Sequence, residues 1–156
     1  MLIRRQRGLT LIESMVALMV ISIGLLGIAS LQGTSMRQTA SSLNHSKAVW
    51  FAYDMADRIR VNTAGAANYA GIDTETEYQQ DCKSAACSAA QMVTADAAAW
   101  SRNLQGLPAG RGMIVGNASR LILTVMWDDE STGARGTDCG PDPEVDLTCY
   151  RITLLP

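Results

Sequence analysis

The sequence predicts an α+β protein in which one long N-terminal helix packs on a small antiparallel sheet. A long apolar stretch comes first, alternating strand-like segments come last, and 156 residues suffice for one domain or one domain with an appendage. This length excludes a multidomain enzyme. The net charge of -2 lacks the basic excess of a nucleic-acid-binding protein, so we expect no nucleic acid partner.

The N-terminus combines a basic leader with an apolar stretch. The first eight residues carry Arg4, Arg5 and Arg7 and no acid, and the stretch from Leu9 to Met36 then contains a single charge, Glu13. About 20 apolar residues cross the hydrocarbon core of a bilayer as a helix. Because basic residues ahead of such a helix stay in the cytoplasm, we expect the rest of the chain on the other side, in the periplasm or its equivalent.

Two ordinary interpretations of this segment are a cleaved secretory signal and a simple signal anchor. Residues Gly27, Ile28 and Ala29 satisfy the small-x-small rule for signal cleavage. Glu13 disfavours a secretory signal, because a carboxylate at the head of an apolar run is costly in lipid unless it is paired or neutralised. The alternative to a paired carboxylate is that Glu13 merely sits at the depth of the lipid headgroups.

We expect the apolar stretch to continue as one helix from about Leu9 to Val61. Apolar residues recur along its second half at steps of three to seven: Met36, Ala40, Leu43, Val49, Trp50, Met55 and Ile59. Asn62, Gly65 and Asn68 are expected to end it. The expected organisation is a leader (1–8), an apolar membrane half of the helix (9–36), an amphipathic half (37–62) and a globular head (63–156).

The head is expected to be a loop, a short helix and a sheet. Residues 63–87 are predicted to form a loop, and Ser88–Leu104 a helix. The inner face of that helix is predicted to hold Met92, Val93, Ala97, Trp100 and Leu104. Predicted strands cover Met113–Val115, Arg120–Trp127 and Cys149–Leu155. Side chains predicted to share one sheet face are Leu121, Leu123, Val125 and Trp127 on the second strand and Tyr150, Ile152 and Leu154 on the third.

The four cysteines are Cys82, Cys87, Cys139 and Cys149. All come after the apolar stretch and are expected in an oxidising compartment, where disulfides persist. Four cysteines allow three pairings, and short sequence separation favours Cys82 with Cys87 and Cys139 with Cys149. The spacings C-x₄-C and C-x₉-C do not fit the paired knuckles of a zinc site.

The residues give no basis for a catalytic site, so we expect no enzyme and no cofactor. The only histidine, His45, is predicted to be a solvated residue on the polar side of the long helix. A Ser/His/Asp or Cys/His centre is hard to build without a second histidine or a clustered nucleophile. The run Gly110-Arg111-Gly112 is too short for a phosphate loop.

Acidic residues cluster in the C-terminal third of the chain. Their number suggests calcium, but no EF-hand spacing occurs, and a solvated acidic loop is the preferred interpretation. The residues concerned are Asp128, Asp129, Glu130, Asp138, Asp142, Glu144 and Asp146.

The leader and the first residues of the apolar stretch resemble the class III signal of type IV prepilins and pseudopilins. The run Gly8-Leu9-Thr10-Leu11-Ile12-Glu13 carries the resemblance. It implies that a membrane-embedded prepilin peptidase cuts after Gly8 and methylates Leu9, where the family usually has Phe. It also implies a pilin fold, and a role for Glu13 in subunit assembly, where its carboxylate neutralises the N-terminal amine of a neighbour. The Cys139–Cys149 segment resembles the disulfide-bounded C-terminal loop of many pilins.

Further segments resemble minor pilins of the PilV type, the type IV pilus modification proteins. These are Ser22–Gln32, Asp57–Asn62 and Leu107–Gly110. This resemblance implies a structural protein of pilus biogenesis that joins other minor pilins in a priming or tip complex and supports twitching motility and adhesion. Its implied partners are the other minor pilins, the major pilin, the prepilin peptidase and the inner-membrane assembly platform. It implies a single-pass inner-membrane protein that later enters the pilus.

Two alternatives stay open at this point. A type II secretion pseudopilin of the GspI type shares the leader and Glu13, and a signal-anchored periplasmic binding or enzymatic domain belongs to another class. Arg58 and Arg60, inside one of the resembling segments, are equally compatible with a cationic helix end facing the helix dipole.

Overall fold

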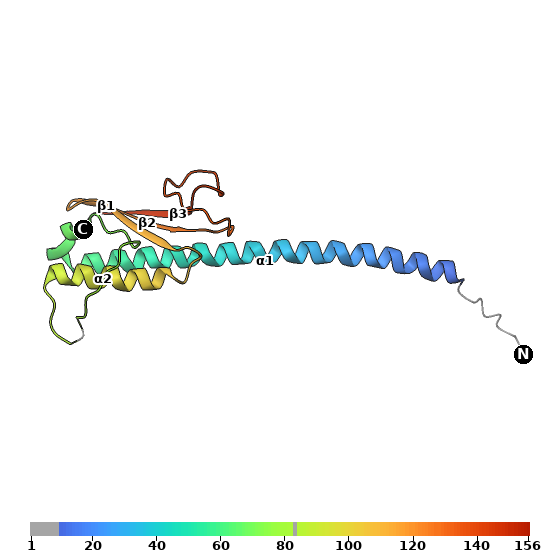
Figure 1. The fold of residues 1–156 in the computed structure, drawn as a ribbon, viewed down its shortest axis with the longest axis horizontal. Coiled ribbons are helices and arrows are strands. Elements are labelled where there is room, and N and C mark those ends of the chain that lie inside the picture. Colours follow the sequence, from blue (N-terminus) through green and yellow to red (C-terminus); the bar gives the residue numbers. More distant parts are fainter. Residues whose placement is uncertain (1–9, 83) are drawn as a thin grey trace, which may run out of the picture. The chain divides into compact units, whose positions relative to one another are not determined.

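The computed structural model describes residues 10–82 and 84–156. The chain divides into two compact units, residues 1–40 and residues 41–156. Helix α1 (Leu11–Val61) belongs to both. The second unit also contains, in chain order, the 3-10 helix η1 (Thr63–Tyr69), α2 (Ala89–Leu104), β1 (Arg111–Asn117), β2 (Arg120–Trp127) and β3 (Thr148–Leu154) (Figure 1). These elements confirm the predicted α+β class.

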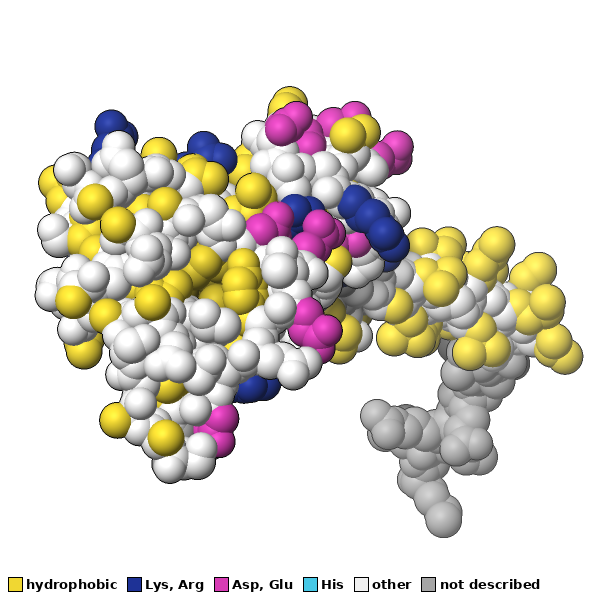
Figure 2. Space-filling model, turned by 60° about the vertical axis from the view of Figure 1, so that its left-hand side comes forward, with side chains coloured by type: hydrophobic (Ala, Val, Ile, Leu, Met, Phe, Trp, Pro, Cys, Tyr) yellow, Lys and Arg dark blue, Asp and Glu magenta, His cyan; other side chains and the backbone are white. Residues whose placement is uncertain are grey.

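In the first unit, α1 carries no charge from Ser14 to Met36 and presents apolar side chains on every side. All of its side chains in this unit are exposed, and apolar ones dominate its visible surface (Figure 2). The hydroxyls of Ser22, Thr34 and Thr39 each donate to the carbonyl four residues earlier, which satisfies them within the helix. By length and composition, α1 is able to cross a membrane.

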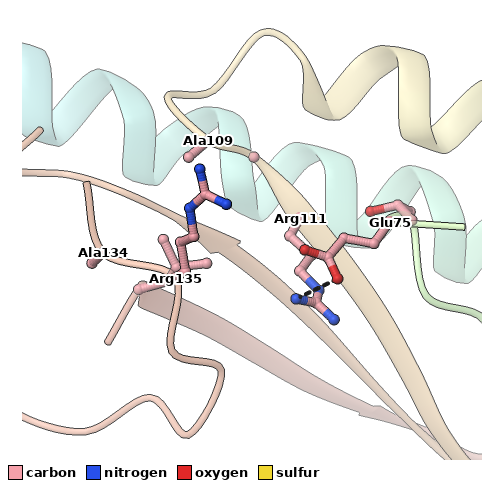
Figure 3. Close-up of a pocket in the computed structure, with 8 residues that line it drawn as sticks. Glu75, Ala109, Arg111, Ala134 and Arg135 are labelled. Carbon is pink, nitrogen blue, oxygen red and sulfur yellow. Dashed lines mark ion pairs between the residues drawn. The ribbon is translucent and has the colours of Figure 1, made fainter. Parts of the chain in front are cut away.

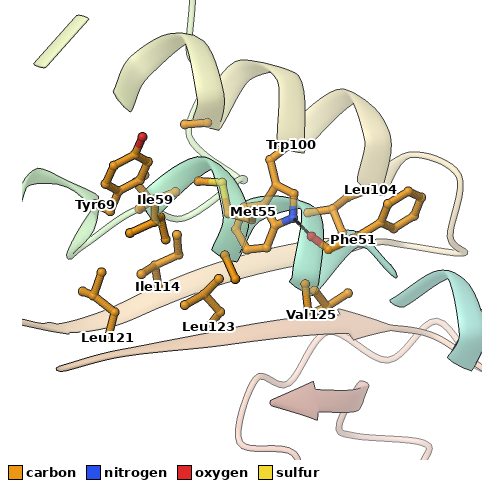
Figure 4. Packing of buried hydrophobic residues seen from close by; sticks show 14 of the residues in the cluster. Phe51, Met55, Ile59, Tyr69, Trp100, Leu104, Ile114, Leu121, Leu123 and Val125 are labelled. Carbon is orange, nitrogen blue, oxygen red and sulfur yellow. Dashed lines mark hydrogen bonds between the residues drawn. The ribbon is translucent and has the colours of Figure 1, made fainter. Parts of the chain in front are cut away.

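In the second unit, α1 buries one side only. The positions buried there repeat at steps of one, three and four: Ala48, Phe51, Ala52, Met55, Ala56 and Ile59. They pack with buried side chains of α2 and the sheet to form the main core (Figure 4). The indole of Trp100 on α2 donates to the backbone oxygen of Phe51 at 3.0 Å, so the largest core side chain is also hydrogen-bonded across the two helices.

The sheet is antiparallel with the order β1-β2-β3. Leu123 of the central strand lies opposite Ile114 on one side and Ile152 on the other. The predicted faces are confirmed, because the named residues of β2 are buried and those of β3 belong to or pack against the main core. The other face of β2 is not solvated as strict alternation implies, since Met126 is buried with Ala134 and Leu147 in a second small cluster.

Helix α2 begins directly after Ser88, the predicted first residue of this helix, and Ser88 caps it. The Ser88 hydroxyl accepts from the Gln91 backbone N–H at 3.3 Å, and the Gln91 side chain accepts from the Ser88 N–H at 2.9 Å. This capping box satisfies two N–H groups that the first turn would otherwise leave open. The predicted inner face is wrong at Met92, which is 37% exposed. The buried Asp96 lies on that face instead.

The predicted loop over 63–87 is wrong at its start, where the chain forms η1. Tyr69 anchors this turn because its ring is fully buried. Gly65 allows the turn to lie close to α2, since an added Cβ would fall 2.9 Å from the Ala89 oxygen. The first strand is longer than predicted because all residues from Arg111 to Asn117 pair with β2. At its start, the Gly112 N–H also donates to the Thr74 hydroxyl at 2.8 Å.

The structure pairs Cys82 with Cys87 and Cys139 with Cys149, the pairing that short sequence separation favours. Cys139 and Cys149 also pack against the small cluster around Met126. The second disulfide therefore joins the long C-terminal loop to β3 and covers part of the core.

We predict that the native, unreduced protein has no free thiol. Closing loops of these lengths stabilises a fold by about 2–3 kcal/mol in the chain-entropy model. Replacing Cys139 and Cys149 by Ser should lower the melting temperature more than replacing Cys82 and Cys87, because only the former pair packs on a buried cluster. Thiol titration of the detergent-solubilised full chain counts the free thiols, and thermal melting measures the loss of stability. Titratable thiols, or a larger loss for the Cys82/Cys87 double variant, would contradict the prediction.

Candidate assembly site

Glu13 lies in the first turn of α1. Its backbone N–H donates to the Thr10 oxygen at 3.0 Å, and its side chain is exposed. A carboxylate at a helix N-terminus is favoured by the unpaired N–H groups of the first turn. The predicted cleavage and methylation positions, Gly8 and Leu9, lie outside the described residues.

On both sides of Glu13, helix α1 presents apolar side chains without a covering layer of its own. Ile12, Val16 and Val20 are 71%, 57% and 65% exposed, and residues 14–36 contain no charge. A soluble surface does not tolerate so much contiguous apolar area. The structure therefore supports lipid or other helices as its environment.

A network of charged and polar side chains joins α1, η1 and α2 in the second unit. The buried Asp96 carboxylate accepts from Arg58 Nη1 at 3.2 Å and from the Tyr69 hydroxyl at 2.6 Å. Arg58 also pairs with Asp54, one turn earlier, at 3.0 Å. Asn62, directly after α1, donates to the Tyr69 oxygen at 3.2 Å. The end of α1 is thus bound to both neighbouring elements.

The electrostatics of this network favour fixed protonation states. Burial lowers the pKa of Arg58, but its hydrogen bonds to the two carboxylates outweigh burial, and its pKa is raised. Burial and the hydrogen bond to Asp96 both raise the pKa of Tyr69. Both groups stay protonated at physiological pH, so both remain hydrogen-bond donors to Asp96. Arg58 is therefore a bridge to α2 and not only a cationic helix end, while Arg60 forms an exposed pair with Asp57.

A pocket of about 290 Å³ opens beside the start of β1 (Figure 3). Arg111 lies in its wall and is paired with Asp73 and Glu75. Burial raises the pKa of Asp73, but the Arg111 guanidinium outweighs burial and holds that pKa below its usual value. Because both carboxylates engage Arg111, this part of the Gly110-Arg111-Gly112 run anchors the segment before α2 and is not poised to bind an anion.

Two acids that the sequence assigned to a solvated loop are structural, which corrects that interpretation. Asp128 is buried and accepts from the N–H groups of Thr132 and Gly133 at 3.0 and 2.8 Å. Asp129 accepts from the Trp127 indole at 2.8 Å and from the Ser41 hydroxyl at 2.5 Å. Across residues 10–82 and 84–156, no three His, Cys, Asp or Glu side chains are grouped to hold a metal ion.

His45 is exposed, as predicted, but it is not simply solvated. Its ring lies edge-on to Trp127 and Tyr150, with centroid distances of 6.1 and 5.7 Å. It therefore covers the edge of the sheet where α1 passes.

Sequence reasoning missed three features of this unit. Asp96 had a detectable signal, since it shares the helical spacing of Val93, Ala97 and Trp100 and is the one carboxylate on that face. Tyr69 had none. The predicted apolar pattern of α1 was wrong at Leu43 and Trp50, which are 55% and 70% exposed.

Tyr69→Phe should destabilise the head by about 2 kcal/mol, because a hydrogen bond to a charged group is lost while Asp96 stays buried. Thermal or denaturant unfolding of the detergent-solubilised full chain measures the loss. Tyr53→Phe is the control, since its ring is 48% exposed and its hydroxyl bonds a neutral group, the Tyr150 hydroxyl, so its change should stay at about 1 kcal/mol or less. Equal effects of the two substitutions would show that the Asp96 contact contributes nothing.

Asp129 should contribute to acid sensitivity. Burial raises its pKa, but hydrogen bonds from Ser41, Trp127 and Asn44 outweigh burial, and the folded-state pKa is lowered. Its stabilisation is thus fully present above the unfolded pKa of about 3.9 and is lost as the pH falls through the folded value. Between pH 5 and pH 3, Asp129→Asn should lose less melting temperature than the wild type. Glu130→Gln serves as the control, and an identical pH profile for Asp129→Asn would refute the assignment.

Two family models match consecutive parts of the chain. Residues 3–29 match the prokaryotic N-terminal methylation motif, and residues 30–98 match the model described as type IV pilin Tt1218. No curated protein and no solved structure matches it. The first match covers the expected leader and the start of the apolar helix, and the second covers the rest of α1, η1 and part of α2. Together with the fold, these matches show a pilus-related chain that is similar to type IV pilins and carries a prepilin methylation motif.

Proposed function

We propose that this chain is a minor pilin of the PilV type that acts in type IV pilus biogenesis. In this role it joins other minor pilins in a priming or tip complex and supports pilus assembly, twitching motility and adhesion. The observation that carries the proposal is the methylation motif over residues 3–29, which runs into a helix with Glu13 in its first turn and no charge from 14 to 36. The segments Ser22–Gln32 and Asp57–Asn62 support the PilV type.

Maturation depends on the leader. The prepilin peptidase cuts between Gly8 and Leu9, and the new amine of Leu9 is methylated. The arginines of the leader hold the N-terminus in the cytoplasm until then, and the head faces the periplasm. The apolar helix is retained, so the protein stays in the inner membrane until it enters the pilus.

Assembly depends on the charge at Glu13. After cleavage, the Leu9 ammonium is a cation near the membrane, and the Glu13 carboxylate of a neighbouring subunit neutralises it. Ion pairs are strong in a medium of low dielectric constant, and an unpaired member there is costly. A subunit whose amine does not meet a carboxylate is therefore penalised, which makes Glu13 a determinant of subunit register.

The exposed apolar surface of α1 requires a new environment once the subunit leaves the bilayer. Helices of other subunits supply it, and the inner-membrane assembly platform is the place where lipid is exchanged for protein. The major pilin and other minor pilins are thus the partners of this surface.

A pseudopilin of type II secretion would share the leader and Glu13. The two systems are separated by the phenotype of a deletion strain: loss of surface pili and twitching supports the proposal, whereas loss of protein secretion with normal pili contradicts it. Mass spectrometry of the mature protein checks the processing step. An N-terminus at methylated Leu9 is expected, and one at Ser30 would indicate a secretory signal.

Glu13→Ala should lower incorporation into pili without affecting export, processing at Leu9 or head stability. The substitution also removes a charge from the apolar segment, which eases membrane insertion by up to roughly 2.5–3.5 kcal/mol. The membrane level should therefore stay constant or rise while the amount in sheared pili falls.

Ser14→Ala, at the next position of the same helix, is the matched control and should incorporate normally. Immunoblots of membranes and sheared pili give both quantities. Normal incorporation of Glu13→Ala would show that the carboxylate is only tolerated at the interface.

A further inference from the structure

One side of α1 in the second unit is exposed although it carries large apolar side chains. Leu43, Trp50 and Val61 are 55%, 70% and 88% exposed. At about 100° per residue they fall within about 20° of one another around the helix, and Asp54 and Asp57 lie within about 20° of that arc. These five residues are called the outer strip.

The outer strip points away from the core of its own unit. The fully buried residues Ala52, Met55 and Ile59 occupy the opposite side of the same turns. The Trp50 ring lies 5.9 Å from that of the core residue Phe51, yet it stays 70% exposed and is not part of the buried core. Large exposed aromatic side chains are typical anchors of protein interfaces.

A groove of about 330 Å³ adjoins the C-terminal end of the strip, between α1 and α2. Val61 and Met92 give it apolar walls, and Asp54, Asp57 and Asp96 line it with carboxylates against one cation, Arg58. Arg58 is already engaged by two of these carboxylates, while the Asp57 side chain is 72% exposed in its pair with Arg60. The groove therefore carries an excess of negative charge between apolar walls.

The chemistry that fits such a groove is a long basic side chain. Lysine and arginine have apolar stems that pack on residues such as Met92, and cationic heads that reach the carboxylates beyond. On a helix, a basic residue next to an apolar seam would place its stem in the groove while the seam covers Leu43 and Trp50.

A second copy of this chain fits poorly. Copies retained by the same N-terminal helix lie parallel, so strips paired in register would bring Asp54 and Asp57 against the same residues of the copy. Like charges in direct opposition destabilise an interface and select against that partner.

We propose that the outer strip docks a helix of a different pilin subunit, which inserts a lysine or arginine into the groove between α1 and α2. The proposal rests on the proposed function, because it takes the partner from the same assembly. It adds that the charge pattern of α1 selects a heterotypic neighbour and disfavours self-pairing.

Photo-crosslinking in cells that assemble pili tests this. In the full-length chain, p-benzoylphenylalanine replaces Leu43, which leaves Trp50 and the groove intact, and the control carries it at Leu155, which is 73% exposed after β3. We expect an adduct at position 43 with a different pilin, mapped by mass spectrometry to a helix that contains a lysine or arginine, and none with that pilin at position 155.

Charge reversal then tests the groove. Asp57→Arg should reduce the yield of the adduct by about tenfold or more, because like charges now meet. Glu144→Arg, an exposed acid in the C-terminal loop, should leave the yield unchanged. Exchanging the mapped basic residue of the partner for glutamate should restore the yield with Asp57→Arg.

Several results would overturn the inference: an adduct with a second copy of this chain, an adduct with lipid alone, no adduct, or a yield that Asp57→Arg does not change. The same cells report on the proposed function through the mature N-terminus and sheared pili. A chain that is processed at Leu9 and enters pili without crosslinking at position 43 refutes only the docking strip. A chain that never enters pili refutes the proposed function itself.

Discussion

One helix has to satisfy two environments, and the rest of the structure depends on that constraint. Along residues 11–40, α1 exposes apolar side chains on all sides, whereas from Ala48 to Ile59 it buries one side against α2 and the sheet. A helix suits both settings because its backbone hydrogen bonds are satisfied internally, in lipid as in protein. What changes along the chain is only the pattern of side chains. The second half needs a partner that supplies an apolar surface on one side, and the small sheet and α2 are that partner.

The head meets this need with a small apolar core and, at one end, a network of hydrogen-bonded polar side chains. Tyr69, Asp96 and Arg58 come from three different elements and satisfy one another, with Tyr69 and Asp96 buried and the Arg58 side chain 34% exposed. A buried carboxylate costs free energy unless it is paired and hydrogen-bonded, so this arrangement gives little net stability over an apolar contact. Its value lies in geometry, because only one placement of η1 and α2 against the end of α1 satisfies all three groups.

Local signals predicted much of this fold and little of its partner-dependent surface. The apolar spacing that includes Val93, Ala97 and Trp100 located α2, the alternation from Leu121 to Trp127 located the central strand, and short separations favoured the observed disulfides. The phase of α1 was not predictable, since Leu43 and Trp50 repeat at helical spacing as Met55 and Ile59 do. Periodicity shows that apolar strips exist but not which of them meets the core. The hydrogen bonds that Asp128 accepts from Thr132 and Gly133 depend on a turn that forms only when the C-terminal loop closes.

In the proposed assembly, two charged positions on α1 act at different strengths because their surroundings differ. Glu13 sits at membrane depth, where a low dielectric constant makes both the free-energy gain from pairing and the cost of staying unpaired large. Asp57 lies in an exposed groove, where water and salt reduce each pair to about 1 kcal/mol or less. Glu13 is thus suited to decide whether a subunit enters at all, and Asp54 and Asp57 to bias which neighbour it meets. The weaker groups need the apolar area of Trp50 and Leu43 beside them, because charge supplies selectivity there and burial supplies affinity. The same helix can therefore make a contact shared by all subunits near its N-terminus, through Glu13, and a contact with one particular neighbour near its C-terminal end.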